Sequence, residues 1–213
     1  MGMTILRKAE HQALSGFALT GKVLDLGGDA RSEYRTLFSG DFAITTVNIL
    51  PEAEPDILAD LEKPLPIPDA SYDAVLLINV LEHVFEYRAL LNECARVVRP
   101  GGTIVIVVPY LFPYHASPSD FHRYSADALS RALTASGFDS AAIRPLGTGL
   151  ISARVVLTER LLPGPVQAVL ALLMHPLAGA LDTLITMLAR LLRKKYSPSD
   201  YALGFFASAK KAV

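Results

Sequence analysis

Residues 72–108, YDAVLLINVLEHVFEYRALLNECARVVRPGGTIVIVV, decide the fold class. The stretch opens with an apolar run at 72–78 and closes with a second one at 103–108. Continuous apolar runs of this length are typical of strands that are buried on both faces of a sheet. Residues 86–98 predict a helix, because the Pro-Gly-Gly at 100–102 is a signal that ends helices. This order of elements predicts a parallel sheet covered by helices.

The alternation of strands and helices continues on both sides of this stretch. It predicts a doubly wound, mostly parallel, Rossmann-like α/β sheet of seven strands. Ser125 is the expected N-cap of one helix, and Gly137 follows the end of that helix. Further strands are expected at 22–26, 42–49, 57–59, 138–146 and 202–209, and further helices at 4–15, 32–39 and 125–136.

The length of the chain, 213 residues, indicates a single domain. We expect four parts within it. An N-terminal helix occupies 1–19, a ligand-binding core 20–149, an apolar helical insertion 150–197, and the last strand with a short tail 198–213.

The insertion breaks the alternation before the last strand. Pro163, Pro165 and Pro176 divide it, and one amphipathic helix is expected from Leu177 onward. Three roles stay open for the insertion: covering the sheet and its ligand site, forming a homodimer interface, or lying on a membrane surface. The helix ends in a basic cluster, made of Arg190, Arg193, Lys194 and Lys195.

A membrane-spanning helix is the least favoured of the roles for this segment. Residues 166–189 are long enough to cross a bilayer. His175, Pro176 and Asp182 lie inside the segment, and each is unfavourable in hydrocarbon. We therefore expect any membrane association to be at the surface.

The composition limits the class of protein further. A single cysteine, Cys94, excludes an internal disulfide framework and a Cys-rich zinc site, and the sequence predicts no metal site of another kind. A formal net charge of −1 argues against nucleic-acid binding. With 51% hydrophobic and 19% charged residues, the chain is expected to expose apolar surface to a partner. The lone thiol and the charged N-terminus favour a cytoplasmic protein.

Polar residues and glycines follow the predicted strands at their carboxyl ends, where ligands bind in open α/β sheets. Asp25, Gly27 and Gly28 close the first strand, and such glycines let the backbone approach a ligand. A tight turn explains these glycines equally well. Asn48 ends the second strand, where it can contact a ribose or cap the strand. Asp60 ends the third strand and can accept a hydrogen bond from an exocyclic amine.

Two further groups of residues face the same edge of the predicted sheet. Asn79 and His83 follow the strand at 72–78, and a functional and a structural role are equally favoured for His83. The tract at 109–124 combines five aromatic side chains with two histidines, one aspartate and one arginine. Loops of this composition at a strand's carboxyl end are the usual place for substrate contacts.

The order of these motifs resembles class I S-adenosylmethionine-dependent methyltransferases of the group with LEHV and PGG signatures. The resemblance rests on VLDLGG at 23–28, ADLEKPLPIPDASYDAVLLINVLEHV at 59–84 and RVVRPGGTIVIVVPY at 96–110. The tract HASPSDFHRY at 115–124 resembles the H-x-x-P-x-D-x-x-R-Y block of a bacterial subgroup linked to glycan or lipid modification.

This resemblance implies a seven-stranded sheet whose last strand is antiparallel, with S-adenosylmethionine as the cofactor. It implies that Asn48 meets the ribose and that Asn79 lies near the sulfonium. The residues implied at the methionine end are Asp25, Gly27 and Gly28, and those implied at the adenine are Asp60 and Leu61.

The chain departs from the family pattern at three positions. Asp29 and Arg31 stand where the pattern has glycines, and Asn48 replaces the usual acidic residue. A methyltransferase-like protein that has lost catalysis and serves as a binding or assembly partner is therefore an alternative. A dinucleotide-dependent oxidoreductase is disfavoured, because the chain lacks the G-x-G-x-x-G pattern.

Methyl transfer requires that a nucleophile attack the sulfonium methyl in line, so positioning carries much of the rate. If the acceptor is a hydroxyl, a general base assists, and His115 is the first candidate and His83 the second. Asp120 can orient a histidine or pair with Arg123, and Arg123 can hold an anionic acceptor. A buried network of Asp120, Arg123 and Tyr124 that shapes the loop is the alternative. The expected acceptor is a small molecule, a glycan or a lipid-linked molecule.

Overall fold

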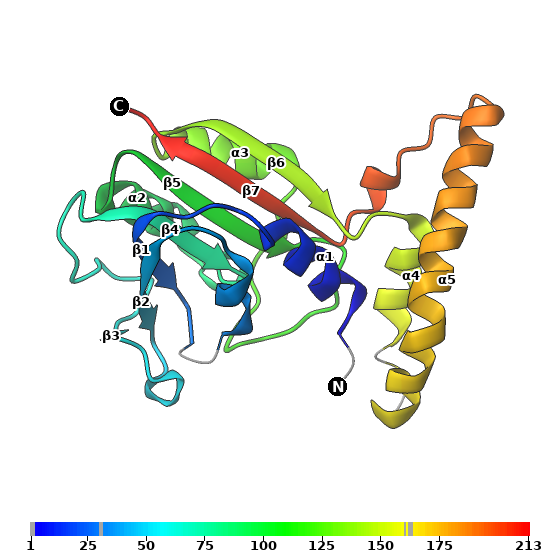
Figure 1. Cartoon of the computed structure of the whole chain (residues 1–213), viewed down its shortest axis with the longest axis horizontal. Coiled ribbons are helices and arrows are strands. Elements are labelled where there is room, and N and C mark those ends of the chain that lie inside the picture. Colours follow the sequence, from blue (N-terminus) through cyan, green and yellow to red (C-terminus); the bar gives the residue numbers. More distant parts are fainter. Residues whose placement is uncertain (1–2, 30–31, 160, 162–163) are drawn as a thin grey trace.

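The computed structural model describes residues 3–29, 32–159, 161 and 164–213 (Figure 1). Its centre is a seven-stranded sheet with the order β3-β2-β1-β4-β5-β7-β6. The strands are β1 (Gly21–Leu26), β2 (Phe42–Asn48), β3 (Ile57–Leu58), β4 (Tyr72–Ile78), β5 (Val98–Pro109), β6 (Phe138–Leu146) and β7 (Gly204–Lys211). The α-helices are α1 (Ile5–Leu14), α2 (Tyr87–Val97), α3 (Ala126–Ala135), α4 (Leu150–Glu159) and α5 (Gly164–Leu191).

The pairing of the strands confirms the predicted fold class. The pairs β2–β3, β1–β2, β1–β4 and β4–β5 are parallel. Strand β7 lies between β5 and β6 and runs antiparallel to both. From β1, the strands that follow in the chain are added first on one side (β2, β3) and then on the other (β4, β5). The polar residues after the parallel neighbours β1 and β4 therefore meet at one edge of the sheet.

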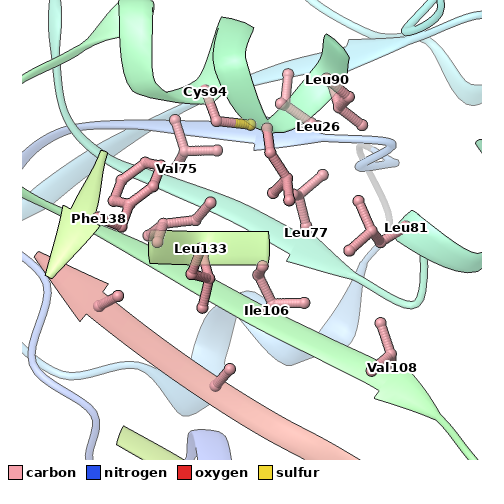
Figure 2. Close-up of a cluster of buried hydrophobic side chains, with 14 of the residues drawn as sticks. Leu26, Val75, Leu77, Leu81, Leu90, Cys94, Ile106, Val108, Leu133 and Phe138 are labelled. Carbon is pink, nitrogen blue, oxygen red and sulfur yellow. The ribbon is translucent and has the colours of Figure 1, made fainter. Parts of the chain in front are cut away.

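Side chains along the central strands point alternately to the two faces of the sheet and are buried on both, so the sheet has an apolar core on each face. In β4, Val75 and Leu77 point to one face, while Leu76 and Ile78 point to the other. The first core contains α2 and α3, with Cys94 and Leu133 packed over β4 and β5 (Figure 2). The second core contains α1 and α4. Helices on both faces make the sheet doubly wound.

Three predicted elements differ in detail from the structure. The helix expected at 32–39 is a short 3-10 helix, η1 (Glu33–Leu37). The strand expected to begin at 103 begins at Val98, because the segment before the glycines already pairs with Tyr72. The helix expected from Leu177 onward is the second part of the longer α5, which continues through Pro176. A proline removes one helical hydrogen bond, and the many other hydrogen bonds of a 28-residue helix retain the helical path.

Helices α4 and α5 form a hairpin before β7, and α5 lies on the side of α4 away from the sheet (Figure 1). Asp182 of α5 joins the two helices. Its carboxylate accepts the backbone N–H groups of Ile151, at 2.8 Å, and Ser152, at 2.9 Å. These are N–H groups of the first turn of α4, which have no partner inside their own helix. The acidic residue that disfavours a spanning helix thus has a structural role inside the hairpin.

Helix α5 has an unusual distribution of apolar side chains. Among the side chains of α5 whose burial the structure describes, the buried ones are His175, Ala178 and Asp182, whereas leucines dominate the exposed face. Leu172 is 77% exposed and Leu184 is 50% exposed. By length and composition, Ala171–Leu191 is the one helical segment of the described residues that meets the criteria for crossing a membrane, which alone is weak support for a span.

Candidate active site

The turn after β1 is built around glycines because side chains would collide there. Gly27 has a φ of +78°, and a Cβ at this position would stand 2.4 Å from Val80. A Cβ on Gly28 would stand 2.4 Å from the carboxylate of Asp25. The turn therefore needs both glycines for its own packing, and their lack of side chains also leaves its backbone open at the carboxyl end of β1.

Asp25 is fully buried under this turn. The hydroxyl of Tyr34 donates to both carboxylate oxygens, at 3.0 and 2.8 Å, and Arg35 Nε approaches Oδ2 at 3.6 Å. Burial is the main reason that the pKa of Asp25 rises to about 6. Two guanidinium nitrogens of Arg35, Nε and one terminal nitrogen, are buried and lack a hydrogen-bond partner within the described part of the chain.

Asn48 fastens the glycine turn to the end of β2. Its side-chain amide donates to the carbonyl oxygens of Gly27 and Gly28, both at 3.1 Å. Its side-chain oxygen accepts the backbone N–H of Leu50 at 3.0 Å. A carboxylate cannot donate these hydrogen bonds, so the departure from the acidic residue of the family pattern has a local structural reason. The side chain still lines the cavity beside it.

A cavity of about 380 Å³ opens at the carboxyl ends of β1, β2 and β4, and we refer to it as the β1–β2 cavity. Asp60 lies at its rim, where Oδ1 accepts the backbone N–H of Glu62 at 3.0 Å. This hydrogen bond is the main reason that the pKa of Asp60 is lowered, so the side chain is an anion at neutral pH. The predicted site residues on its wall are Gly27, Asn48, Asp60, Leu61, Asn79 and His83.

A second cavity, of about 390 Å³, lies between α1 and the sheet, and we refer to it as the α1 cavity. Asn79 and His83 line both cavities, so the two meet there. Glu10 of α1 lines this cavity, where Asn79 hydrogen-bonds its carboxylate and Arg7 approaches at 3.5 Å. Burial raises the pKa of Glu10. The N-terminal helix is therefore part of the site.

The tract after β5 is held against the short helix η3 (Leu81–His83) by backbone hydrogen bonds. The N–H groups of Phe121 and His122 both donate to the carbonyl oxygen of Glu82. The hydroxyl of Tyr124 donates to the carbonyl oxygen of Leu81 at 3.1 Å. Through this docking, residues 115–124 reach side chains that lie more than 30 positions earlier in the chain.

The docking produces a cluster of three ionisable side chains, Glu82, His83 and His115. The Nε2 atoms of His83 and His115 lie 3.7 and 3.6 Å from Glu82 Oε1. The two imidazole rings meet edge to face, with their centroids 5.1 Å apart. Glu82 is the main reason that the pKa of His115 is raised. Both histidines predicted as candidate bases are thus brought together beside the α1 cavity.

Asp120 and Arg123 form a two-point ion pair beside this cluster. The guanidinium donates to both carboxylate oxygens of Asp120, and Arg123 is the main reason that the pKa of Asp120 is lowered to about 2. Asp120 Oδ2 accepts the backbone N–H of His115 at 2.9 Å. Arg123 also donates to the carbonyl oxygen of His122. Tyr124 is buried in the first core. These contacts correspond to the loop-shaping network that was the alternative to direct substrate contact.

Four residues of the site carried no functional prediction: Tyr34, Arg35, Glu10 and Glu82. Tyr34 and Arg35 lie outside the glycine turn in the sequence, and only their contact with Asp25 assigns them to the site. For Glu82, its position directly before His83 in the sequence is the one signal that could have indicated a functional role. Of the two residues that replace glycines, Asp29 donates its N–H to Ser32 Oγ at 3.1 Å, and Arg31 lies outside the described residues.

Residues 35–106 match the family model described as a methyltransferase domain, Methyltransf_11. A protein of Mycolicibacterium smegmatis, named as an S-adenosylmethionine-dependent methyltransferase, is 32% identical over 81 residues, covering 35% of this chain and 32% of that protein. A demethylmenaquinone methyltransferase of Mycobacterium sp. (strain JLS) is 33% identical over 114 residues, covering 50% of this chain and 49% of that protein. The chain spans about a third and about a half of the lengths of these curated relatives.

Solved structures share the fold. The complex between the Haloferax volcanii Trm112 methyltransferase activator and a protein described as a methyltransferase matches with a TM-score of 0.61 and 15% identity, over 98% of this chain and 90% of that chain. The [4+2]-cyclase SpnF matches with a TM-score of 0.56 and 18% identity, over 96% of this chain and 78% of that chain. Because SpnF is described as a cyclase, this fold alone does not define a reaction.

The residues at the β1–β2 cavity fit S-adenosylmethionine. The glycine turn leaves backbone exposed where side chains would collide, and Gly27 lines the cavity. Asp60 supplies an anionic acceptor at the rim. The matched domain, the named relatives and the fold agree with this fit. Residues 35–106 of the chain are therefore similar to a methyltransferase domain, and the chain has the Rossmann-like fold of these solved structures.

Proposed function

We propose that this protein transfers the methyl group of S-adenosylmethionine to an oxygen of a small, sugar or lipid-linked acceptor. The meeting of two cavities at Asn79 and His83 carries the proposal. The β1–β2 cavity has the size and polar rim for the cofactor, and the α1 cavity is adjacent to it on the acceptor side. A methyl group at their junction is open to attack from the α1 cavity.

The cofactor would be held by the residues that the family resemblance implies. Gly27 and Gly28 open the turn, and Asp60 and Leu61 flank the adenine side. Asn48 acts through the turn that it fastens. When bound, the cofactor supplies a sulfonium methyl, whose S–C bond breaks as the acceptor O–C bond forms, leaving a neutral sulfur and a proton from the hydroxyl.

We propose that the cluster of Glu82, His83 and His115 handles the hydroxyl proton, with His115 as the first candidate base and His83 as the second. Both imidazoles line the α1 cavity, next to the position proposed for the methyl group. Asp120 and Arg123 position His115 through its backbone and ring. The resemblance of residues 115–124 to the H-x-x-P-x-D-x-x-R-Y block supports an acceptor of the glycan or lipid class.

The acceptor proposal is tested by incubating the full chain with methyl-labelled S-adenosylmethionine and extracts of the source cells. We expect a labelled product that resists mild alkali, as an ether does, and that partitions into an organic or an aqueous phase according to its class. His115→Ala should remove at least about 90% of the label incorporation, since general base catalysis contributes about 10²–10⁴-fold. If the His115→Ala variant forms the labelled product as fast as the wild type does, the assignment of His115 as the base is contradicted.

The second candidate function is a binding or assembly protein without catalysis. Asp29, which stands in the glycine turn in place of a glycine, is the observation that favours it. This candidate predicts that the chain binds S-adenosylmethionine or its product and incorporates no label into any extract. Incorporation of label above the level of a heat-treated control excludes it.

We propose further that the exposed face of α5 lies on an anionic membrane surface at the cytoplasmic side. A helix packed on its own protein buries its leucines, whereas α5 exposes them and buries His175, Ala178 and Asp182. The exposed basic cluster Arg190, Arg193, Lys194 and Lys195 follows the apolar face directly. Apolar area beside cationic side chains is the combination that binds anionic lipid surfaces.

Flotation with lipid vesicles tests the membrane proposal. The chain should float with vesicles that contain phosphatidylserine and float less with phosphatidylcholine alone. Leu184→Glu with Leu191→Glu should abolish flotation without unfolding the chain, because both side chains are at least half exposed. A chain that stays at the bottom with both kinds of vesicle contradicts the proposal, and a dimer that the double variant dissociates would assign this face to a second copy.

A further inference from the structure

Glu82 is a fully buried carboxylate whose charge the fold leaves without a hydrogen-bonding partner. The side chain is 0% exposed, and neither Oε1 nor Oε2 accepts a hydrogen bond from the described residues. Burying an anion in this way is costly unless a cation or a proton compensates it. Its closest ionisable neighbours are the Nε2 atoms of His83 and His115.

Both imidazoles are oriented so that Nε2 faces Glu82. The Nδ1 atom of His83 contacts the carbonyl oxygen of Ser119. The Nδ1 atom of His115 lies 3.2 Å from the carbonyl oxygen of Pro113 and 3.3 Å from Asp120 Oδ2. Around His115 Nδ1, a guanidinium nitrogen of Arg123 also lies at 3.4 Å. A proton on Nδ1 satisfies the carbonyl oxygen beside each ring, and in that tautomer of the neutral ring Nε2 is unprotonated. Hydrogen bonds of this kind from Nδ1 are the usual support of a metal-binding histidine.

The distances between Glu82 and the two imidazoles indicate whether a proton or a metal ion compensates the charge of Glu82. A proton on either Nε2 would form a hydrogen bond with Glu82, but 3.6 and 3.7 Å are too long for one. Two ligand atoms that each lie about 2.1 Å from a tetrahedral ion are about 3.4 Å apart. The ligand atoms of the three residues all lie within 4.8 Å of one another. The two distances to Glu82 Oε1 are close to the separation of ligand atoms on such an ion.

We propose that Glu82, His83 and His115 bind one divalent transition-metal ion at the wall of the α1 cavity. Two imidazole nitrogens and one carboxylate oxygen suit zinc, manganese, iron or cobalt, and an all-oxygen site would be needed for calcium. His83 and His115 line the cavity, so the remaining coordination positions of the ion face it. This site departs from the expectation that the chain binds no metal.

One consequence rests on the proposed function. An ion on both Nε2 atoms would take the place of His115 and His83 as the group that promotes deprotonation. An acceptor hydroxyl bound to the ion would lose its proton more readily, and the proton would pass to water in the α1 cavity. The ion would then also hold the acceptor oxygen beside the methyl group, which favours acceptors with a hydroxyl that can reach a metal. Binding of the ion itself does not depend on this consequence.

The test is a titration of the full chain, freed of metal by a chelator, with Co²⁺ alone, followed by visible absorption. We expect one equivalent of Co²⁺ to give the ligand-field bands of a site with nitrogen ligands. Glu82→Gln and His115→Gln should each weaken binding by about 100-fold or more, because changes outside the ligand set already cost about 10–100-fold. His11→Gln is the matched control, since His11 lies on α1 outside the cluster, and it should bind Co²⁺ as the wild type does.

Two results would overturn the site. One is a wild-type chain that binds Co²⁺ no more tightly than Glu82→Gln, while both melt as folded proteins. The other is binding that survives both ligand substitutions. Titration with S-adenosylmethionine in the same samples keeps the two proposals separate, because cofactor binding uses the β1–β2 cavity and requires no ion.

Discussion

The Asp25 carboxylate occupies the space that a side chain at position 28 would need, so only glycine fits there. A methyl group there would stand 2.4 Å from Asp25 Oδ2, so Gly28→Ala must displace either the turn or the carboxylate. We expect the substitution to weaken S-adenosylmethionine binding by about tenfold or more, because a shift costing about 1.4 kcal/mol already has this effect. Calorimetric titration measures it. Gly179→Ala is the matched control, since a Cβ on Gly179 meets nothing within 4 Å and should leave binding unchanged.

Asp25 also makes the stability of the cofactor-free protein depend on pH. Its pKa of about 6 in the fold lies above the value of 3.8 expected for the unfolded chain. The folded state therefore holds a proton that the unfolded state releases, and this stabilisation is present below pH 4 and is lost as the pH rises to about 6. The loss amounts to about 3 kcal/mol. Urea unfolding of the wild type and Asp25→Asn between pH 4 and 7 should show the wild type losing stability relative to the variant, and a constant difference would contradict this account.

Substitution of Tyr124 shows whether this residue of the loop after β5 has a structural or a catalytic role. Its hydroxyl donates to Leu81, and its ring is buried in the first core. Tyr124→Phe should lower the free energy of unfolding by about 1 kcal/mol, because it leaves a buried carbonyl without its donor. If the role is structural, thermal unfolding shifts while kcat falls less than about threefold. A fall in kcat of a hundredfold or more with unchanged stability would instead assign the hydroxyl to the reaction.

At the level of elements, Asp182 connects the two helices of the α4–α5 hairpin. Asp182→Ala leaves the N–H groups of Ile151 and Ser152 without acceptors, and loss of a cap of this kind costs about 1–2 kcal/mol. Hydrogen exchange should show faster exchange of these two amides. Thr183→Ala is the control, because Thr183 is exposed and bonds only within its own helix. Equal exchange in the two variants would contradict the capping role.

Elements were predictable where the pattern of side chains is local. The runs at 72–78 and 103–108 are apolar at every position that the sheet buries, and Ser125 caps α3 as its position before an amphipathic stretch predicts. The path of α5 through Pro176 was not predictable, because hydrogen bonds elsewhere in the long helix maintain it. The sequence carried no prediction for Glu82. Its burial comes from the docking of 115–124, which depends on backbone contacts between distant segments.

At the scale of the whole molecule, the site lies where three distant segments meet. The glycine turn after β1, the segment after β4 and the tract after β5 converge because parallel strands end at one edge of the sheet. Helix α1 closes the site from a part of the chain that precedes the sheet. Sequence motifs predicted the first three segments, and the role of α1 required the packed structure, because its contacts with Asn79 span about 70 residues.

The division into a cofactor cavity and an acceptor cavity is the central claim, and cofactor binding tests it most directly. Calorimetric titration of the full chain with S-adenosylmethionine and S-adenosylhomocysteine, with NAD as the control, should give micromolar binding of the first two and none of NAD. Leu61→Trp, which narrows the β1–β2 cavity, should weaken that binding, and Thr4→Trp, which narrows the α1 cavity, should not. Absence of binding by a folded chain, or equal loss in both variants, would contradict the account.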